Sequence, residues 1–171
     1  RDIDRSRGSE MCIRDSNSVF VALHVTNRLD SISKMIADKR KVKNVYVTKG
    51  ELEKNSFCEI LQENNINLIV LAGFLLKLPS RLVCAYDKKI VNLHPSLLPK
   101  FGGKGMYGDN VHLKVLESGE KKTGITIHYV NEEYDRGDII FQKEIVLSDL
   151  ESLETLREKI REVEYLSLIH I

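Results

Sequence analysis

The chain has 171 residues, a formal net charge of +1 at pH 7 and 42% hydrophobic residues. This near-neutral charge gives no reason to expect a nucleic acid or an anionic membrane as a partner, and no apolar run approaches the roughly 20 residues that span a bilayer. The length suits one domain with a hydrophobic core.

Strand-like and helix-like patterns alternate in the first half of the chain. Val19–Val25 is predicted to be a buried strand, and a helix is expected from about Ser31. Val45–Val47 predicts a second, short strand, and Thr48 is of the type that caps the helix expected after it. Asn67–Gly73 is nearly all apolar, which is typical of a strand covered on both faces.

The alternation continues with a short helix opened by Pro79, whose missing N–H does no harm in a first turn. Lys89–His94 predicts another strand, which Pro95 ends, and Asn110–Glu117 has the pattern of a helix that stops at Gly119. The middle of the chain therefore repeats the strand-helix order of its start.

Two strands and a helix complete the pattern. Gly124–Val130 and Asp138–Leu147 predict strands on either side of a polar turn, and a final helix is expected from Asp149 or Ser152. Alternation of this kind predicts an α/β fold, an open, mostly parallel twisted sheet with a more antiparallel end. The five histidines are scattered without paired ligand spacing, so we expect no metal site.

Both ends of the chain have the mark of a foreign DNA sequence. Back-translation of Leu166–Ile171 gives a string whose reverse complement encodes Met-Cys-Ile-Arg-Asp and the start of a serine codon, which matches Met11–Ser16. The string resembles a transposon adapter used for sequencing libraries. We therefore expect residues 1–16 and 166–171 to be non-native, and residues 17–165 to be one incomplete domain.

Polar side chains come together at the end of one predicted strand. Asn92 and His94 are two residues apart, so their side chains point to the same face. They lie at the carboxyl end of the strand, where open α/β sheets bind ligands. Because buried amides and imidazoles need partners, two interpretations stay open: a functional pair, or two ordinary hydrogen-bonded residues at a strand end.

Two loops add weaker signals. The loop Gly102–Gly108 is rich in glycine, although it matches neither the Walker spacing nor the dinucleotide-binding pattern. The turn Asn131–Asp138 concentrates polar residues between apolar strands, and it could equally be a solvated hairpin turn. Neither loop identifies a function alone.

Four motifs together are more specific. They are Val70–Phe74, Asn92–Pro99, Thr123–His128 and Asp135–Ile140. In composition, order and spacing they resemble the folate-dependent formyltransferase family, and Gly102–Gly108 resembles the branch that formylates glycinamide ribonucleotide. The resemblance implies a Rossmann-like formyltransferase fold in a cytoplasmic enzyme of de novo purine biosynthesis. Its formyl donor would be 10-formyltetrahydrofolate and its acceptor the amine of 5′-phosphoribosylglycinamide, with no metal.

The resemblance also implies a catalytic set of Asn92, His94 and Asp135. The amine attacks the formyl carbon, and negative charge then grows on the formyl oxygen. The amide of Asn92 and a protonated His94 can stabilise that oxyanion, while Asp135 keeps His94 charged and relays the amine proton. His128 would have a supporting or structural part, and His112 is a further candidate for the substrate side; both could equally be ordinary histidines.

By the same resemblance, folate lies against two loop segments. The residues expected there are Leu75, Leu76, Lys77, Leu78, Asn131, Glu132, Glu133, Tyr134 and Asp135. Many relatives have arginine where this chain has Leu76, so only backbone contacts are expected there. The amine substrate is expected to contact Asn92 and, on the last helix, Arg161 and Glu164. These last two are spaced i and i+3 and could instead form a surface ion pair.

One departure from the family pattern affects the expected activity. Family members begin with a strand and a Gly-Ser-x-x-Ser-Asn-type loop that holds the substrate phosphate, whereas this chain starts at the second strand. We therefore expect the chain as written to bind glycinamide ribonucleotide poorly or not at all, and to aggregate, because a lost central strand leaves unpaired edges.

Related activities remain as alternatives. Formyltetrahydrofolate deformylase shares the Asn-x-His pair but usually has a second histidine where this chain has Pro95. Methionyl-tRNA formyltransferase needs a basic extension and a different loop. A catalytically inactive, folate-binding fragment is the third alternative.

Overall fold

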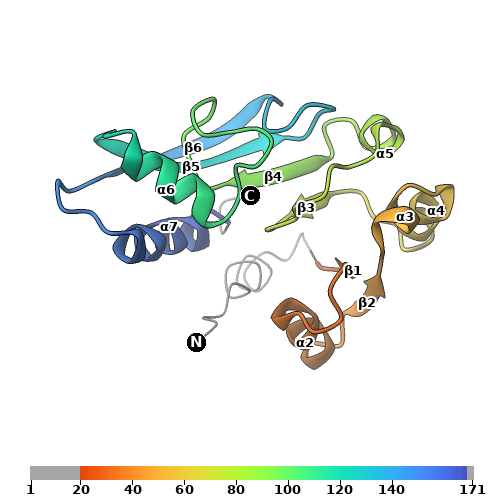
Figure 1. Cartoon of the computed structure of the whole chain (residues 1–171). Coiled ribbons are helices and arrows are strands. Elements are labelled where there is room, and N and C mark those ends of the chain that lie inside the picture. Colours follow the sequence, from red (N-terminus) through yellow and green to blue (C-terminus); the bar gives the residue numbers. More distant parts are fainter. Residues whose placement is uncertain (1–19, 169–171) are drawn as a thin grey trace. The chain divides into compact units, whose positions relative to one another are not determined.

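The structure is a computed structural model that describes residues 20–168, with side chains up to Leu166 (Figure 1). The predicted non-native segment 1–16 and residues 169–171 lie outside the described residues. The chain divides into two units, one up to Asn67 and one from Leu68 to Ser167.

The first unit is a strand-helix-strand element followed by two helices. Its strands β1 and β2 pair in parallel, and its helix α2 contacts both of them. The elements are β1 (Leu23–Thr26), α2 (Ile32–Lys39), β2 (Lys43–Tyr46), α3 (Lys49–Leu52) and α4 (Asn55–Glu63).

Local capping determines where these helices start. Ser31 accepts a hydrogen bond from the Lys34 N–H at the start of α2. At α3 the Thr48 hydroxyl accepts from the Glu51 N–H, and the Glu51 carboxylate accepts from the Thr48 N–H at 2.8 Å. This reciprocal capping box confirms the predicted role of Thr48.

The first predicted strand is shorter than expected. β1 begins only at Leu23, and Phe20 is 80% exposed. The pairing explains this: Leu23 lies opposite Lys43, the first residue of β2, and the N–H of the preceding Val42 donates to the Ala37 carbonyl oxygen of α2 instead.

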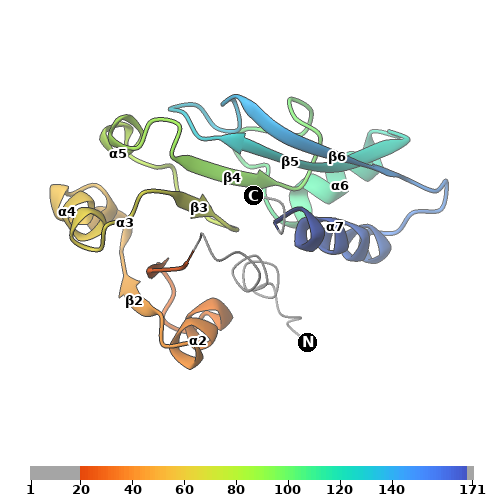
Figure 2. The same ribbon diagram turned by 180° about the vertical axis from the view of Figure 1, so that it is seen from behind.

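The second unit contains a four-stranded sheet in the order β3-β4-β5-β6 (Figures 1 and 2). β3 and β4 are parallel, whereas β5 is antiparallel to both of its neighbours, β4 and β6. The α/β fold with an antiparallel end is therefore confirmed. The elements are β3 (Ile69–Leu71), α5 (Ser80–Ala85), β4 (Ile90–His94), α6 (Asp109–Glu117), β5 (Lys122–Tyr129), β6 (Ile139–Val146) and α7 (Leu153–Leu168).

The hydrogen bonds define two sheets rather than one continuous sheet. Among residues 20–168, β1 pairs only with β2, and β3 pairs with β4 alone. Val70 of β3 is 48% exposed, so the prediction of a strand covered on both faces is wrong at this position.

A cluster of apolar side chains joins α6, β5 and α7. It is formed by Val115, Ile125, Leu147, Leu156 and Ile160, each at most 8% exposed. Burial of aliphatic side chains in such a cluster contributes about 1.5–3 kcal/mol each. α7 itself continues to Leu168 and so crosses the predicted domain boundary after residue 165.

The pairing register separates apolar from polar residues on the sheet. Leu93 of β4 lies opposite Ile127 of β5, whereas Asn92 lies opposite His128 and His94 opposite Thr126. Directly opposed residues share a face, and neighbours along a strand alternate. The polar residues named here therefore gather on one face of the sheet.

A buried carboxylate precedes α7 and makes stability dependent on pH. Glu151 accepts hydrogen bonds from Lys159 Nζ at 2.5 Å, Thr155 Oγ1 at 2.5 Å and the Ser148 N–H at 3.1 Å. Led by the bond from Lys159, these contacts lower the pKa of Glu151 from 4.5 to about 2.

Because the folded-state pKa of Glu151 is depressed, its stabilising contribution is present above the unfolded pKa and is lost as pH falls through the folded one. We expect the free energy of unfolding to decrease between about pH 5 and pH 2, and to decrease less in Glu151→Gln. Urea titrations at several pH values measure this. Glu154→Gln, an exposed change on the first turn of α7, should retain the wild-type pH dependence.

Candidate functional site

Two side chains from β4 form the centre of the site. Asn92 is half-buried, and its amide Nδ2 lies 3.1 Å from His128 Nε2 on β5. His94 is only 3% exposed, and its Nε2–H donates to the carbonyl oxygen of Phe101 at 2.8 Å. Both residues thus have partners, as buried polar groups require.

Asp135 reaches the same place from the turn after β5. Its Oδ1 lies 3.7 Å from His94 Nδ1 and 3.7 Å from His128 Nε2. Its Oδ2 accepts a hydrogen bond from the Gly103 N–H at 2.8 Å. Its backbone has φ of +54°, a left-handed conformation that aspartate tolerates better than most residues. The structure therefore brings together Asn92, His94 and Asp135.

The hydrogen bonds determine which histidine nitrogens carry protons. A carbonyl oxygen can only accept, so the Phe101 carbonyl requires a proton on His94 Nε2 and leaves Nδ1, which faces Asp135, as the site that titrates. In the same way, His128 Nδ1–H donates to the Tyr129 carbonyl oxygen at 2.7 Å. His128 Nε2 is thereby directed toward Asn92 and Asp135.

Burial and charge act against each other at this site. Burial lowers the pKa of His94, although the nearby Asp135 and the Phe101 carbonyl act to raise it. For Asp135, burial raises the pKa, but the nearby imidazoles of His128 and His94 and the hydrogen bond from the Gly103 N–H hold it below its usual value. A charged His94 therefore depends on the carboxylate of Asp135.

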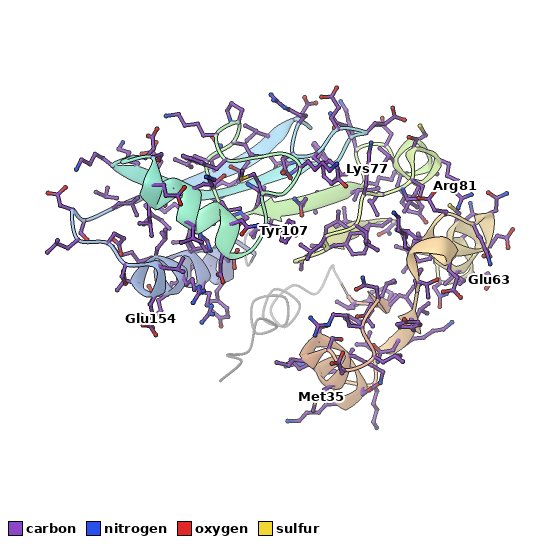
Figure 3. All side chains as sticks on the ribbon, viewed as in Figure 1. Met35, Glu63, Lys77, Arg81, Tyr107 and Glu154 are labelled. Carbon is purple, nitrogen blue, oxygen red and sulfur yellow. The ribbon has the colours of Figure 1, made fainter. Side chains whose placement is uncertain are left out.

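A pocket of about 70 Å³ opens beside Asn92 and Asp135. It is lined by Leu71, Phe74, Leu76, Lys77, Leu78, Asn92, His128, Val130, Asn131, Glu132, Glu133, Tyr134 and Asp135. Every residue predicted to contact folate is in this wall except Leu75, which is 56% exposed. Lys77, labelled in Figure 3, holds its ammonium 5.9 Å from the ring centroid of Tyr134, a cation–π contact between the two loops.

The structure does not bring every predicted residue to this pocket. Arg161 and Glu164 are half-buried on α7, and neither lines the pocket wall. Arg157, one turn before Arg161, makes a bidentate pair with Asp109 at the start of α6, at 2.7 and 2.5 Å. The predicted contact of Arg161 and Glu164 with substrate is a proposal that the pocket geometry does not test.

His128 lies at the site. It faces Asn92, approaches Asp135 and lines the pocket. The sequence feature that could have placed His128 at the site is its position in the Thr123–His128 motif, two residues after Thr126 and thus on the same face of the strand. His112, by contrast, is buried on α6 and is absent from the pocket wall.

Within residues 20–168, no group of three or more His, Cys, Asp or Glu side chains is arranged to hold a metal ion. No helix in that part of the chain is both long and apolar enough to cross a membrane.

The fold and the site together define an α/β protein with an amide, an imidazole and a carboxylate grouped at the end of a sheet strand, beside a pocket. Such a group suits transfer of an acyl-type group. Residues 11–171 match the family model described as "Formyl transferase", and the chain belongs to that family. The match overlaps both of the terminal segments that the sequence analysis expects to be non-native.

Named relatives agree with this assignment. The chain is 36% identical over 162 residues to chloroplastic phosphoribosylglycinamide formyltransferase of Arabidopsis thaliana. This match covers 91% of this chain and 56% of the relative. It is 38% identical over 120 residues to the phosphoribosylglycinamide formyltransferase of Bacillus subtilis, covering 70% of this chain and 58% of that protein. The chain thus spans little more than half of these relatives.

Solved structures share the fold. The phosphoribosylglycinamide formyltransferase of Anaplasma phagocytophilum superposes with a TM-score of 0.84 at 30% identity, covering 96% of this chain and 80% of that one. A formyltetrahydrofolate deformylase from Pseudomonas syringae gives 0.76 at 25% identity, covering 88% of this chain and 49% of the deformylase. The predicted formyltransferase fold is confirmed.

Proposed function

We propose that this chain transfers the formyl group of 10-formyltetrahydrofolate to the amine of 5′-phosphoribosylglycinamide in purine biosynthesis. The observation that supports this most directly is the convergence of Asn92, His94 and Asp135 beside the pocket. The names of the relatives in plants and bacteria favour phosphoribosylglycinamide as the acceptor of the formyl group.

In the proposed reaction the substrate amine attacks the formyl carbon, and a C–N bond forms. The negative charge that develops on the formyl oxygen is stabilised by the Asn92 amide N–H and by His94 protonated at Nδ1. Asp135 stabilises that imidazolium and accepts the proton that the amine loses. When the bond from the formyl carbon to N10 of the folate breaks, this proton goes to N10, so the products are the formylated amide and tetrahydrofolate.

We propose that the folate occupies the pocket between the loops 75–78 and 131–135. In this arrangement Leu76 offers backbone contact, and Lys77 adds a cation to the wall. Arg161 and Glu164 stay proposed contacts of the amine substrate. The cytoplasmic location also stays a proposal, since two plant relatives have names that place them in the chloroplast.

One other activity has a specific observation in its favour. The similarity to a deformylase structure supports hydrolysis of the same folate, in which water replaces the amine. Pro95 stands where deformylases usually have a second histidine, and this favours transfer to the amine.

The test is to incubate the purified chain with 10-formyltetrahydrofolate, with and without glycinamide ribonucleotide, and to quantify the products by mass spectrometry. Because the chain is expected to bind the amine substrate weakly, that substrate is titrated to saturation. We expect formylated glycinamide ribonucleotide and tetrahydrofolate in equal amounts. Formate released without the amine would identify a deformylase, and folate binding without either product would identify an inactive folate-binding protein.

A further inference from the structure

Gln142 on β6 belongs to none of the motifs that define the site, yet its side chain is hydrogen-bonded to the loop that follows His94 and to Thr126. Its amide Nε2 donates one hydrogen bond to the Leu98 carbonyl oxygen at 2.9 Å and another to Thr126 Oγ1 at 2.9 Å. An amide NH₂ has two protons, so both donors are used.

The register places Gln142 in a row of residues across three strands. Thr126 lies opposite His94 on one side and opposite Gln142 on the other. All three side chains therefore lie on the same face of the sheet. Thr126, at the centre of the row, is fully buried.

The hydroxyl of Thr126 holds the loop that follows His94. It donates to the Ser96 carbonyl oxygen at 2.7 Å and accepts from the Leu98 N–H at 3.0 Å. Together with the bond from Gln142 to the Leu98 carbonyl oxygen, three backbone groups are held: the Ser96 carbonyl, the Leu98 N–H and the Leu98 carbonyl. Ser96 Oγ also donates to the Lys100 carbonyl oxygen at 2.9 Å, which extends the constraint along the loop.

This loop supplies both backbone groups that orient the catalytic pair. The Phe101 carbonyl accepts from His94 Nε2, and the Gly103 N–H donates to Asp135 Oδ2. If the loop shifts, His94 loses the acceptor that selects its Nε2–H tautomer, and Asp135 loses a donor.

We propose that Gln142 is a positioning residue that holds the loop 96–103 through Thr126 and Leu98. The loop in turn keeps the Phe101 carbonyl in place as the acceptor of the His94 Nε2–H. His94 Nδ1 is then left facing Asp135. Gln142 touches neither His94 nor the pocket wall. Only the expected effect of Gln142 on the reaction rate rests on the proposed function. The tautomer of His94 can be measured in the absence of substrate.

The test compares Gln142→Leu with Lys143→Leu in the full chain. Lys143 is the next residue of β6, is exposed and points to the opposite face of the sheet. Its replacement by leucine therefore places the same new side chain on the same strand without removing the bonds of Gln142. The tautomer ratio of His94 is measured by ¹⁵N NMR above its pKa. Gln142→Leu should lower the ratio of Nε2–H to Nδ1–H about fivefold, the loss expected for one net hydrogen bond. Lys143→Leu should keep the wild-type ratio.

A pH titration of the same signals is a second measurement. The titratable groups that face His94 are Asp135 and His128, and both variants keep them. Since the Phe101 carbonyl favours the protonated ring, its displacement in Gln142→Leu should lower the pKa of His94. Gln142→Glu replaces the two N–H donors of the amide by a carboxylate, which is repelled by the Leu98 carbonyl oxygen. This variant should therefore lower the ratio of Nε2–H to Nδ1–H, as Gln142→Leu does.

The kinetic consequence is a decrease in kcat of about tenfold for Gln142→Leu with an unchanged KM for folate, because the pocket wall is untouched. A wild-type tautomer ratio in folded Gln142→Leu and Gln142→Glu would overturn the proposal. If the wild-type chain transfers no formyl group, the proposed function fails, but the NMR comparison still decides the role of Gln142.

Discussion

Asp135→Asn is expected to lower kcat for formyl transfer by about 10²–10⁴-fold with little change in folate affinity. The carboxylate of Asp135 is the charge that opposes the effect of burial on His94, and in the proposed reaction it also accepts the amine proton. Asparagine keeps the shape and can still accept from the Gly103 N–H, so the turn should remain in place. Steady-state kinetics and folate binding by calorimetry measure the two effects.

The control for this prediction is Asp138→Asn, the same change of charge on the same turn. Asp138 is exposed, and its backbone carbonyl, which accepts from the Tyr129 N–H, is unaffected by the substitution. Its kcat should stay at the wild-type value. Equal activity of the Asp135→Asn enzyme and the wild type would rule out Asp135 as the proton acceptor.

Gly124→Ala is expected to destabilise the protein by about 3 kcal/mol or more. A Cβ at this buried position of β5 would lie 1.9 Å from the Lys143 carbonyl oxygen on β6 and 2.9 Å from Leu97 Cδ2. The nearest obstacle is backbone, which cannot rotate away as a flexible side chain can. The strands β5 and β6 would have to separate, and urea unfolding should show a lower midpoint.

Gly50→Ala is the matched control, since it adds the same methyl group. Gly50 lies in helix α3, and a Cβ there would meet nothing within 4 Å. Alanine is the better helix former, so this change should be neutral or stabilising by up to about 1 kcal/mol. Equal unfolding midpoints for the two variants would contradict the close approach of β6 to Gly124.

Several elements could be predicted from sequence because their signals are local. Thr48 and Glu51 form a capping box within one turn of chain, and Ser31 caps α2 through Lys34. Strand ends were less predictable. β1 is shorter than its apolar run because pairing, not hydrophobicity, ends a strand, and the exposed side chain of Val70 depends on which segments cover it.

The candidate site divides along the same line. By itself the sequence determined that Asn92 and His94 share one face at a strand end, because side chains alternate along any strand, and its motifs pointed to Asp135 and to the loops that line the pocket. Only the tertiary structure decided that His128 faces Asn92, that His94 is buried with its proton on Nε2, and that Gln142 reaches the loop after His94. The reason is physical: these contacts join residues far apart in the chain, so they depend on strand register and on how loops close, and neither is encoded in any local pattern.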